Sequence, residues 1–146
     1  GYQVLAWNHR PERLEALPEQ ADLLESWMDQ HMGPASSPGG TIQPRAELSA
    51  LDARADVVLD CIVEDMAQKI DLFSRFPAAT ERGALFLTTT SGLSITELGR
   101  RSGCAELMAG AHFWDPPHLM PLVEVIRGED ISDPVLEHHP PPSAAT

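Results

Sequence analysis

The amino-acid sequence predicts an α/β fold, with a partial doubly wound, mainly parallel sheet and helices on both of its faces. Two observations support this fold class. Short apolar runs with strand character alternate with segments whose apolar residues have helical spacing. The run ADVVLDCIV, at residues 55–63, is almost continuously apolar, as expected of a parallel strand covered on both faces. Alternation of strand and helix is typical of doubly wound sheets.

The N-terminal third is expected to contain one strand and a broken helix. QVLAW, at residues 3–7, is typical of a short buried strand. Residues 11–32 carry apolar residues near helical spacing, and Pro11 suits the first turn of a helix. Pro18 should divide this helix into two pieces, because proline has no N–H to donate within a helix. A loop, a brief extended piece and a short helix are then expected at residues 33–40, 41–43 and 46–52.

The rest of the chain is expected to alternate helices and strands. MAQKIDLFSRF, at residues 66–76, has the spacing of a helix. Its inward-facing residues are expected to be Ile70, Leu72 and Phe73. Another helix begins at Ser94, which with Glu97 three residues later forms a capping box. Further strands are expected at residues 83–90, 107–113 and 122–128.

Polar side chains follow several of these strands. Asn8 and Arg10 follow the first, Glu64 follows the run at 55–63, and Thr89, Thr90 and Ser91 close the next one. His112 stands near the end of a fourth strand. Ligands of doubly wound sheets bind outside the carboxyl ends of the strands. Polar groups at several such ends therefore predict one binding site at this edge of the sheet.

Composition excludes some classes of function. The 146 residues suffice for one domain with a core, and the net charge of −12 disfavours an unspecific nucleic-acid binder, because phosphate would be repelled. No apolar run is long enough to cross a bilayer and no leader opens the chain, so no membrane partner and a cytoplasmic location are expected. Cys61 and Cys104 lack C-x-x-C spacing and are expected to be reduced, in apolar surroundings. The histidines have no metal-ligand spacing, so no metal site is expected.

Three stretches carry a resemblance to a known family. DVVLDCIVEDMAQKIDLF, TTTSGLSITEL and GAHFWDPPHLMPLVEVIRG together resemble the cofactor-binding domain of the 3-hydroxyacyl-CoA dehydrogenase family, in order and at family spacing. The resemblance is close over residues 55–128 and looser over 1–15. It implies a Rossmann domain of an NAD- or NADP-dependent oxidoreductase of fatty acid metabolism. The implied reaction interconverts a 3-hydroxyacyl-CoA, or a related small 3-hydroxy acid, and its 3-keto form.

The resemblance also implies roles for individual residues. The family's catalytic acid/base falls on His112, and the glutamate that orients it falls on Glu124, which would explain a carboxylate within an apparently buried strand. Histidine suits this role because it titrates closest to neutrality. The serine that hydrogen-bonds the substrate oxygen falls on Ser91, and Asp115 stands where the family has a substrate-side asparagine. Cofactor contacts are implied for Glu64, Lys69 and the backbone of Cys61.

Simpler interpretations of these residues stay open. His112 could be a hydrogen-bonded core histidine, and His118 a loop residue. Glu64 could be an acid favoured by the dipole at a helix N-terminus, and Lys69 a solvated helix residue.

The sequence also departs from the family pattern. It has no G-x-G-x-x-G motif, so residues 1–135 are expected to form a truncated dinucleotide-binding domain, followed by a disordered proline-rich tail at 136–146. The family's strand order is 3-2-1-4-5-6, so the missing first strand would be the central one, and this chain alone is expected not to bind dinucleotide tightly. The family's helical second domain is also expected to be missing, and with it the contacts of a parent homodimer.

Position 8 affects the choice between NAD and NADP. Asn8 replaces the acid that normally binds the adenosine ribose, and Arg10 could accommodate a 2′-phosphate. WNHRPER is in this respect similar to NADP-linked β-hydroxyacid dehydrogenases, although that family has a central lysine in place of a His–Glu pair. Two alternatives are therefore kept: an NADP-linked β-hydroxyacid-type dehydrogenase, and a catalytically silent fragment or scaffold module of the 3-hydroxyacyl-CoA dehydrogenase family.

Overall fold

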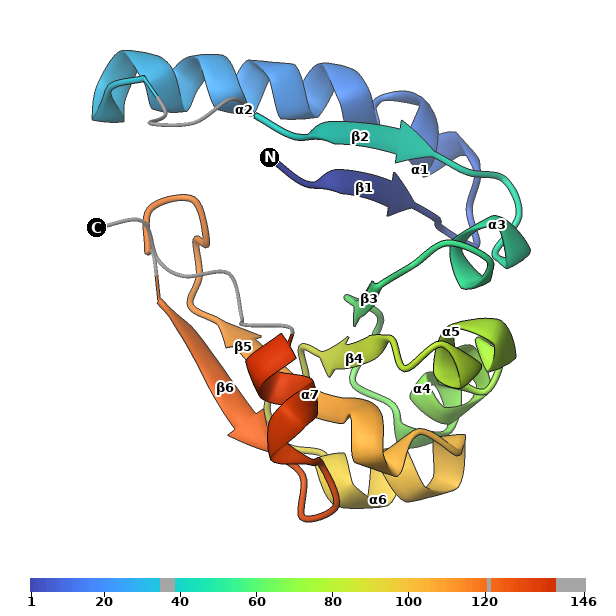
Figure 1. Ribbon diagram of the computed structural model, residues 1–146. Coiled ribbons are helices and arrows are strands. Elements are labelled where there is room, and N and C mark those ends of the chain that lie inside the picture. Colours follow the sequence, from blue (N-terminus) through green and yellow to red (C-terminus); the bar gives the residue numbers. More distant parts are fainter. Residues whose placement is uncertain (35–38, 121, 139–146) are drawn as a thin grey trace. The chain divides into compact units, whose positions relative to one another are not determined.

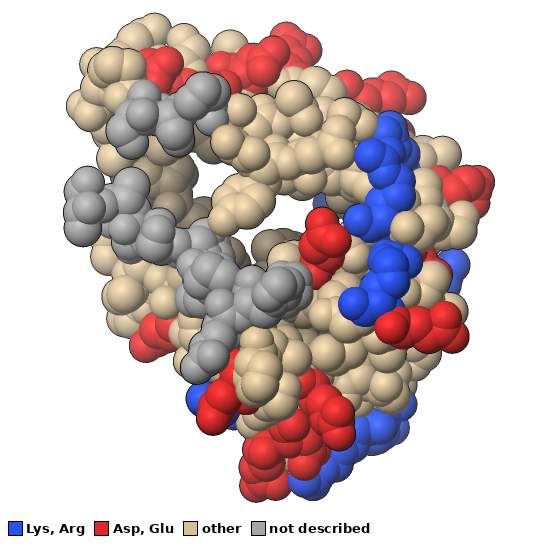
Figure 2. All heavy atoms as spheres, viewed as in Figure 1, with Lys and Arg blue, Asp and Glu red and all other residues tan. Residues whose placement is uncertain are grey.

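The computed structural model describes residues 1–34, 39–120 and 122–138, which fall into two compact units, Gly1–Leu51 and Asp52–Thr146. Each unit has its own sheet, and most strand pairs in them are parallel (Figure 1). The predicted α/β class with mainly parallel strands is therefore confirmed. Acidic side chains are scattered over the face shown in Figure 2, which agrees with the net charge of −12.

The first unit is a parallel strand pair with a helical connection. β1 (Gln3–Ala6) pairs in parallel with β2 (Thr41–Pro44). Parallel neighbours need a long crossover, which α1 (Glu12–Glu15) and α2 (Leu17–Met32) supply. The predicted division of this helix is confirmed, and Pro18 lies in the first turn of α2, where its missing N–H costs no hydrogen bond. A short helix, α3 (Ser49–Asp52), begins in this unit and ends on the first residue of the next.

The second unit contains a four-stranded sheet in the order β3-β4-β5-β6. β3 (Val57–Asp60), β4 (Leu85–Thr88) and β5 (Met108–Phe113) run parallel, and β6 (Val123–Arg127) returns antiparallel to β5. All four strands were predicted, each slightly longer than observed. Among the described strands, β1, β2, β3 and β6 each have one edge without a strand partner.

Helices lie on both faces of this sheet, as predicted, although Val57 and Leu59 of β3 stay exposed. Along β4 successive side chains point to opposite faces. One face packs against α7 (Asp133–His138) in a cluster of Leu85, Leu87, Ala109, Ala111, Ile131, Val135 and Leu136. Phe86 is fully buried and contacts Phe73 and Phe76 edge-on, with ring centroids 5.8 and 6.2 Å apart.

The other helices of the unit are short and capped. α4 (Met66–Phe73) begins at Asp65, whose side chain accepts from the N–H of Gln68. α6 (Ile95–Ser102) begins at Ser94, which accepts from the N–H of Glu97 as the capping box predicted. The sequence did not predict α5 (Pro77–Glu81), the 3₁₀ turn at Ala105–Leu107 or α7. α7 includes residues 136–138, which were assigned to the tail, while 139–146 lie outside the described residues.

Three strands are more exposed than the sequence predicted. In β1 and β3, which were expected to be buried, Val4, Val57 and Leu59 are 44%, 45% and 44% exposed. β6 differs most. It was predicted to be buried, yet it is an edge strand whose residues are exposed, apart from the half-buried Val123. The carboxylate of Glu124 therefore keeps contact with water and does not need a buried partner to be tolerated.

Candidate active site

The candidate site lies at the carboxyl ends of β4 and β5 and begins with a cross-strand pair. His112 and Glu124 are direct partners in the antiparallel β5–β6 register. Side chains of such partners lie on the same face of the sheet and approach closely. His112 Nδ1 is 3.0 Å from Glu124 Oε2, so the predicted hydrogen bond between adjacent strands is confirmed.

Ser91 extends this pair on the other side of the imidazole. Its Oγ lies 3.1 Å from His112 Nε2. An ionised carboxylate can only accept, so in the neutral imidazole Nδ1 carries the proton and Nε2 presents a lone pair. The Ser91 hydroxyl then donates to Nε2, which gives a chain of three groups that share protons.

This chain of groups is open to solvent. The side chains of His112 and Glu124 are 32% and 50% exposed. Ser91 is exposed as well, in the loop after β4. The interpretation of His112 as a closed core histidine is therefore wrong, because a small molecule can reach its ring.

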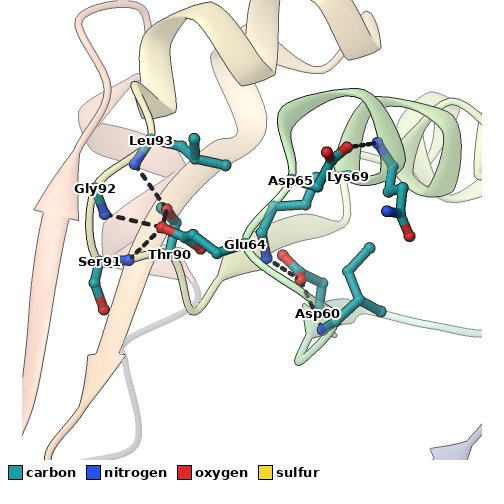
Figure 3. A network of polar contacts seen from close by, with 10 residues as sticks. Asp60, Glu64, Asp65, Lys69, Thr90, Ser91, Gly92 and Leu93 are labelled. Atoms are coloured by element: carbon teal, nitrogen blue, oxygen red, sulfur yellow. Dashed lines mark hydrogen bonds and ion pairs between the residues drawn. The ribbon is translucent and has the colours of Figure 1, made fainter.

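Glu64 stands beside Ser91, in the loop between β3 and α4 (Figure 3). Its Oε1 accepts hydrogen bonds from Thr90 Oγ1 at 2.5 Å and from the N–H groups of Ser91 and Gly92, both at 3.0 Å. The hydrogen bond from the Thr90 hydroxyl has the largest effect in lowering the pKa of the Glu64 carboxyl. The hydrogen bonds from the N–H groups of Gly92 and Ser91 lower this pKa further. Glu64 is not the cap of α4, since Asp65 fills that place.

Lys69 is enclosed. Its Nζ lies 2.5 Å from Asp60 Oδ1, and both side chains have no solvent exposure. The interpretation of Lys69 as a solvated helix residue is therefore wrong, and a cofactor could reach its ammonium only if the pair opened. Asp60 also accepts from the N–H of Ile62 at 3.2 Å. Asp60 was not predicted as a site residue, although an acid that ends an apolar strand just before a helix with a lysine is a usable signal.

The cysteines differ in environment. Both are free; Cys104 is buried, and this burial raises the pKa of its thiol to about 12. Cys61 is exposed at the carboxyl end of β3, and partial desolvation, followed by the charge of Asp60, also raises the pKa of its thiol. Asp115 is exposed in the turn after β5.

The residues predicted to read the ribose belong to the first unit. Asn8 Oδ1 accepts from the N–H of Arg10 at 2.9 Å, in the turn after β1. Arg10 is exposed there.

Within the described parts of the chain, no three His, Cys, Asp or Glu side chains are grouped as metal ligands. The described helices include none long and apolar enough to cross a membrane.

The chain is similar to known proteins over most of its length. Residues 1–139 match the family of the 3-hydroxyacyl-CoA dehydrogenase NAD-binding domain. The chain is 33% identical over 134 residues to L-carnitine dehydrogenase of Nocardiopsis dassonvillei, covering 88% of this chain and 39% of that protein.

Two solved structures are also similar. The chain superposes on 5-formyl-3-hydroxy-2-methylpyridine 4-carboxylic acid 5-dehydrogenase, an NAD⁺-dependent dismutase, with a TM-score of 0.82 at 26% identity, covering 95% of this chain and 45% of that one. On 3-hydroxybutyryl-CoA dehydrogenase of Escherichia coli the chain superposes with a TM-score of 0.73 at 28% identity. This match covers 94% of this chain and 30% of that one. This chain spans less than half the length of each of these relatives.

Proposed function

Because the chain belongs to the family of the 3-hydroxyacyl-CoA dehydrogenase NAD-binding domain, we propose that the complete protein is an NAD-dependent dehydrogenase. Its substrate is a 3-hydroxyacyl-CoA or a small 3-hydroxy acid, which it interconverts with the 3-keto form. The similar proteins named for 3-hydroxybutyryl-CoA and for L-carnitine support both substrate classes.

The contact between His112 and Glu124 carries this proposal. A secondary alcohol loses a proton from oxygen while hydride leaves carbon, so the reaction needs a base at the hydroxyl. The carboxylate of Glu124, 3.0 Å from Nδ1, favours the tautomer that carries its proton on Nδ1. His112 Nε2 therefore presents a lone pair. After proton transfer, the same carboxylate stabilises the imidazolium.

Ser91 completes the substrate side. Its hydroxyl, 3.1 Å from Nε2, is placed to donate to the same substrate oxygen that His112 deprotonates. In the reverse direction His112 returns the proton to the oxygen of the ketone. When bound, the oxidised nicotinamide would accept the hydride in alcohol oxidation, and the reduced nicotinamide would return it in the reverse direction.

The chain's residues fit part of a dinucleotide site. Cys61 and Ser91 are exposed at the carboxyl ends of β3 and β4, where doubly wound sheets bind ligands. Asn8 and Arg10 follow β1 and leave position 8 without the acid that repels a 2′-phosphate. We infer that residues 1–135 contribute to the cofactor domain and that NADP is tolerated beside NAD.

The test is a spectrophotometric assay of NADH formation by the complete protein, with 3-hydroxybutyryl-CoA and with L-carnitine as substrates. His112→Asn should lower kcat by about 10²–10⁴-fold, the range contributed by a general base. Glu97→Gln, which changes an exposed acid paired with Arg101, is the matched control and should leave kcat unchanged. Absence of turnover in the wild type, with NAD bound, would favour the catalytically silent scaffold.

A further inference from the structure

One carboxylate oxygen ties together two loops of the candidate site. Glu64 comes from the loop between β3 and α4, while its three donors, Thr90, Ser91 and Gly92, are consecutive in the loop between β4 and α6 (Figure 3). All three bonds end on Oε1. We call this set of contacts the Glu64 clamp.

The Glu64 clamp fixes the residue that faces the histidine. The backbone N–H of Ser91 donates to Glu64, while the hydroxyl of the same residue lies 3.1 Å from His112 Nε2. Thr90 adds a second restraint, because its hydroxyl donates to Glu64 and accepts from the N–H of Leu93 at 2.9 Å. Hydrogen bonds to Glu64 and from Leu93 therefore fix the turn at residues 90–93. The orientation of the Ser91 side chain then depends on the position of Glu64.

The loop that carries Glu64 is itself anchored. Asp60, at the end of β3, binds the N–H of Ile62 and the buried ammonium of Lys69 from α4. Asp65 caps the same helix through the N–H of Gln68. Both ends of the loop are therefore fixed, and the Asp60–Lys69 ion pair joins β3 to α4.

We propose that Glu64 is a positioning residue, which acts through Ser91 to hold its hydroxyl against His112, and that Asp60 and Lys69 support it. This inference rests on the proposed function. It assigns Glu64 and Lys69 differently from the resemblance, which implied direct cofactor contacts for both. Hydrogen bonds from three donors to a charged oxygen are charge-assisted, and such bonds are stronger than neutral ones.

Amide hydrogen exchange tests the clamp in the complete protein without cofactor or substrate. Glu64→Ala should raise the exchange rates of the Ser91 and Gly92 amides by at least about tenfold, since both lose their acceptor. Thr90→Val removes the hydroxyl and should also raise these rates, whereas Thr90→Ser should restore them. Glu97→Gln, an exposed acid on α6, is the control for a change of charge and should have no effect.

Kinetics and NAD binding separate positioning from cofactor contact. Glu64→Ala should lower kcat by roughly 10–100-fold, as small misplacements of catalytic groups do, with the Kd of NAD within about threefold. Thr90→Val should lower kcat in the same direction and Thr90→Ser should recover it. The Thr90 pair keeps the inference falsifiable if Glu64→Ala does not fold.

Three results would overturn the inference. One is unchanged exchange at Ser91 and Gly92 in Glu64→Ala; another is equal kcat in Thr90→Val and Thr90→Ser. The third is a Kd for NAD raised more than tenfold at unchanged kcat, which would restore the direct contact. If instead His112→Asn keeps full turnover while the exchange results hold, the proposed function fails and the clamp stands as a structural device.

Discussion

Lys69→Met is the substitution whose cost follows most directly from the structure. Methionine keeps the length and most of the volume of lysine, so packing around α4 changes little. The substitution leaves Asp60 with a buried carboxylate and no counter-ion, because both side chains are without solvent exposure. Asp60 Oδ2 already lacks a hydrogen-bond partner among the described residues, so no local donor takes over.

The magnitude of this effect is large compared with the stability of a domain. Removing one partner of a buried pair costs about 3–5 kcal/mol, against a typical total of about 5–15 kcal/mol. Urea denaturation followed by circular dichroism measures the loss as a lower midpoint at constant slope. The double variant Asp60→Leu with Lys69→Met should recover most of it, since replacing both charges by apolar groups is often neutral. A loss below about 1 kcal/mol in Lys69→Met would show that the pair is not isolated from water.

Three further predictions concern cofactor, pH and thiols. Asn8→Asp in the complete protein should shift the NAD/NADP ratio of kcat/KM toward NAD by on the order of tenfold, because a carboxylate repels the 2′-phosphate; an unchanged ratio would mean that position 8 does not read the ribose. The pKa of Glu64 is lowered on folding, so its contribution to amide protection at Ser91 and Gly92 is fully present above the ordinary value of 4.5 and is lost as pH falls through the lowered value. Glu64→Gln should remove this acid limb of the exchange profile, and a limb that persists would assign it to another group. At pH about 8, a thiol reagent should modify the exposed Cys61 first and Cys104 only on unfolding, since burial raises the pKa of Cys104 to about 12; equal rates in the native protein would contradict that burial.

The sequence predicts the strands well because each is a local signal. LFLT is largely apolar and buried throughout, as a parallel strand covered on both faces requires, whereas in VVLD only alternate residues are buried. β6 has similar residues but lies at the edge of the sheet. Its exposure depends on the pairing of strands, and the composition of a strand does not encode this pairing. α5 and α7 were missed because each is too short for a helical period to show.

The site divides in the same way. The resemblance to the 3-hydroxyacyl-CoA dehydrogenase family was enough to predict that His112 meets Glu124, and the antiparallel pairing of β5 with β6 brings the two residues together. The burial of Lys69 and the hydrogen bonds of Glu64 to residues 90–92 arise from contacts between separate segments of the chain. In sequence, a buried lysine on a helix looks the same as a solvated one. Only the folded structure shows that Asp60 is the partner of Lys69.

The turnover of Glu124→Gln in the complete protein tests the central claim most directly. Glutamine preserves the size of the side chain and an acceptor for Nδ1, but removes the charge that stabilises the imidazolium. Glu124 is 50% exposed, so loss of packing contributes little. With NAD and 3-hydroxybutyryl-CoA, kcat should fall by on the order of 10²-fold or more while KM stays within about threefold. Equal losses in kcat and in substrate affinity, or an unchanged kcat, would contradict a catalytic pair of His112 and Glu124.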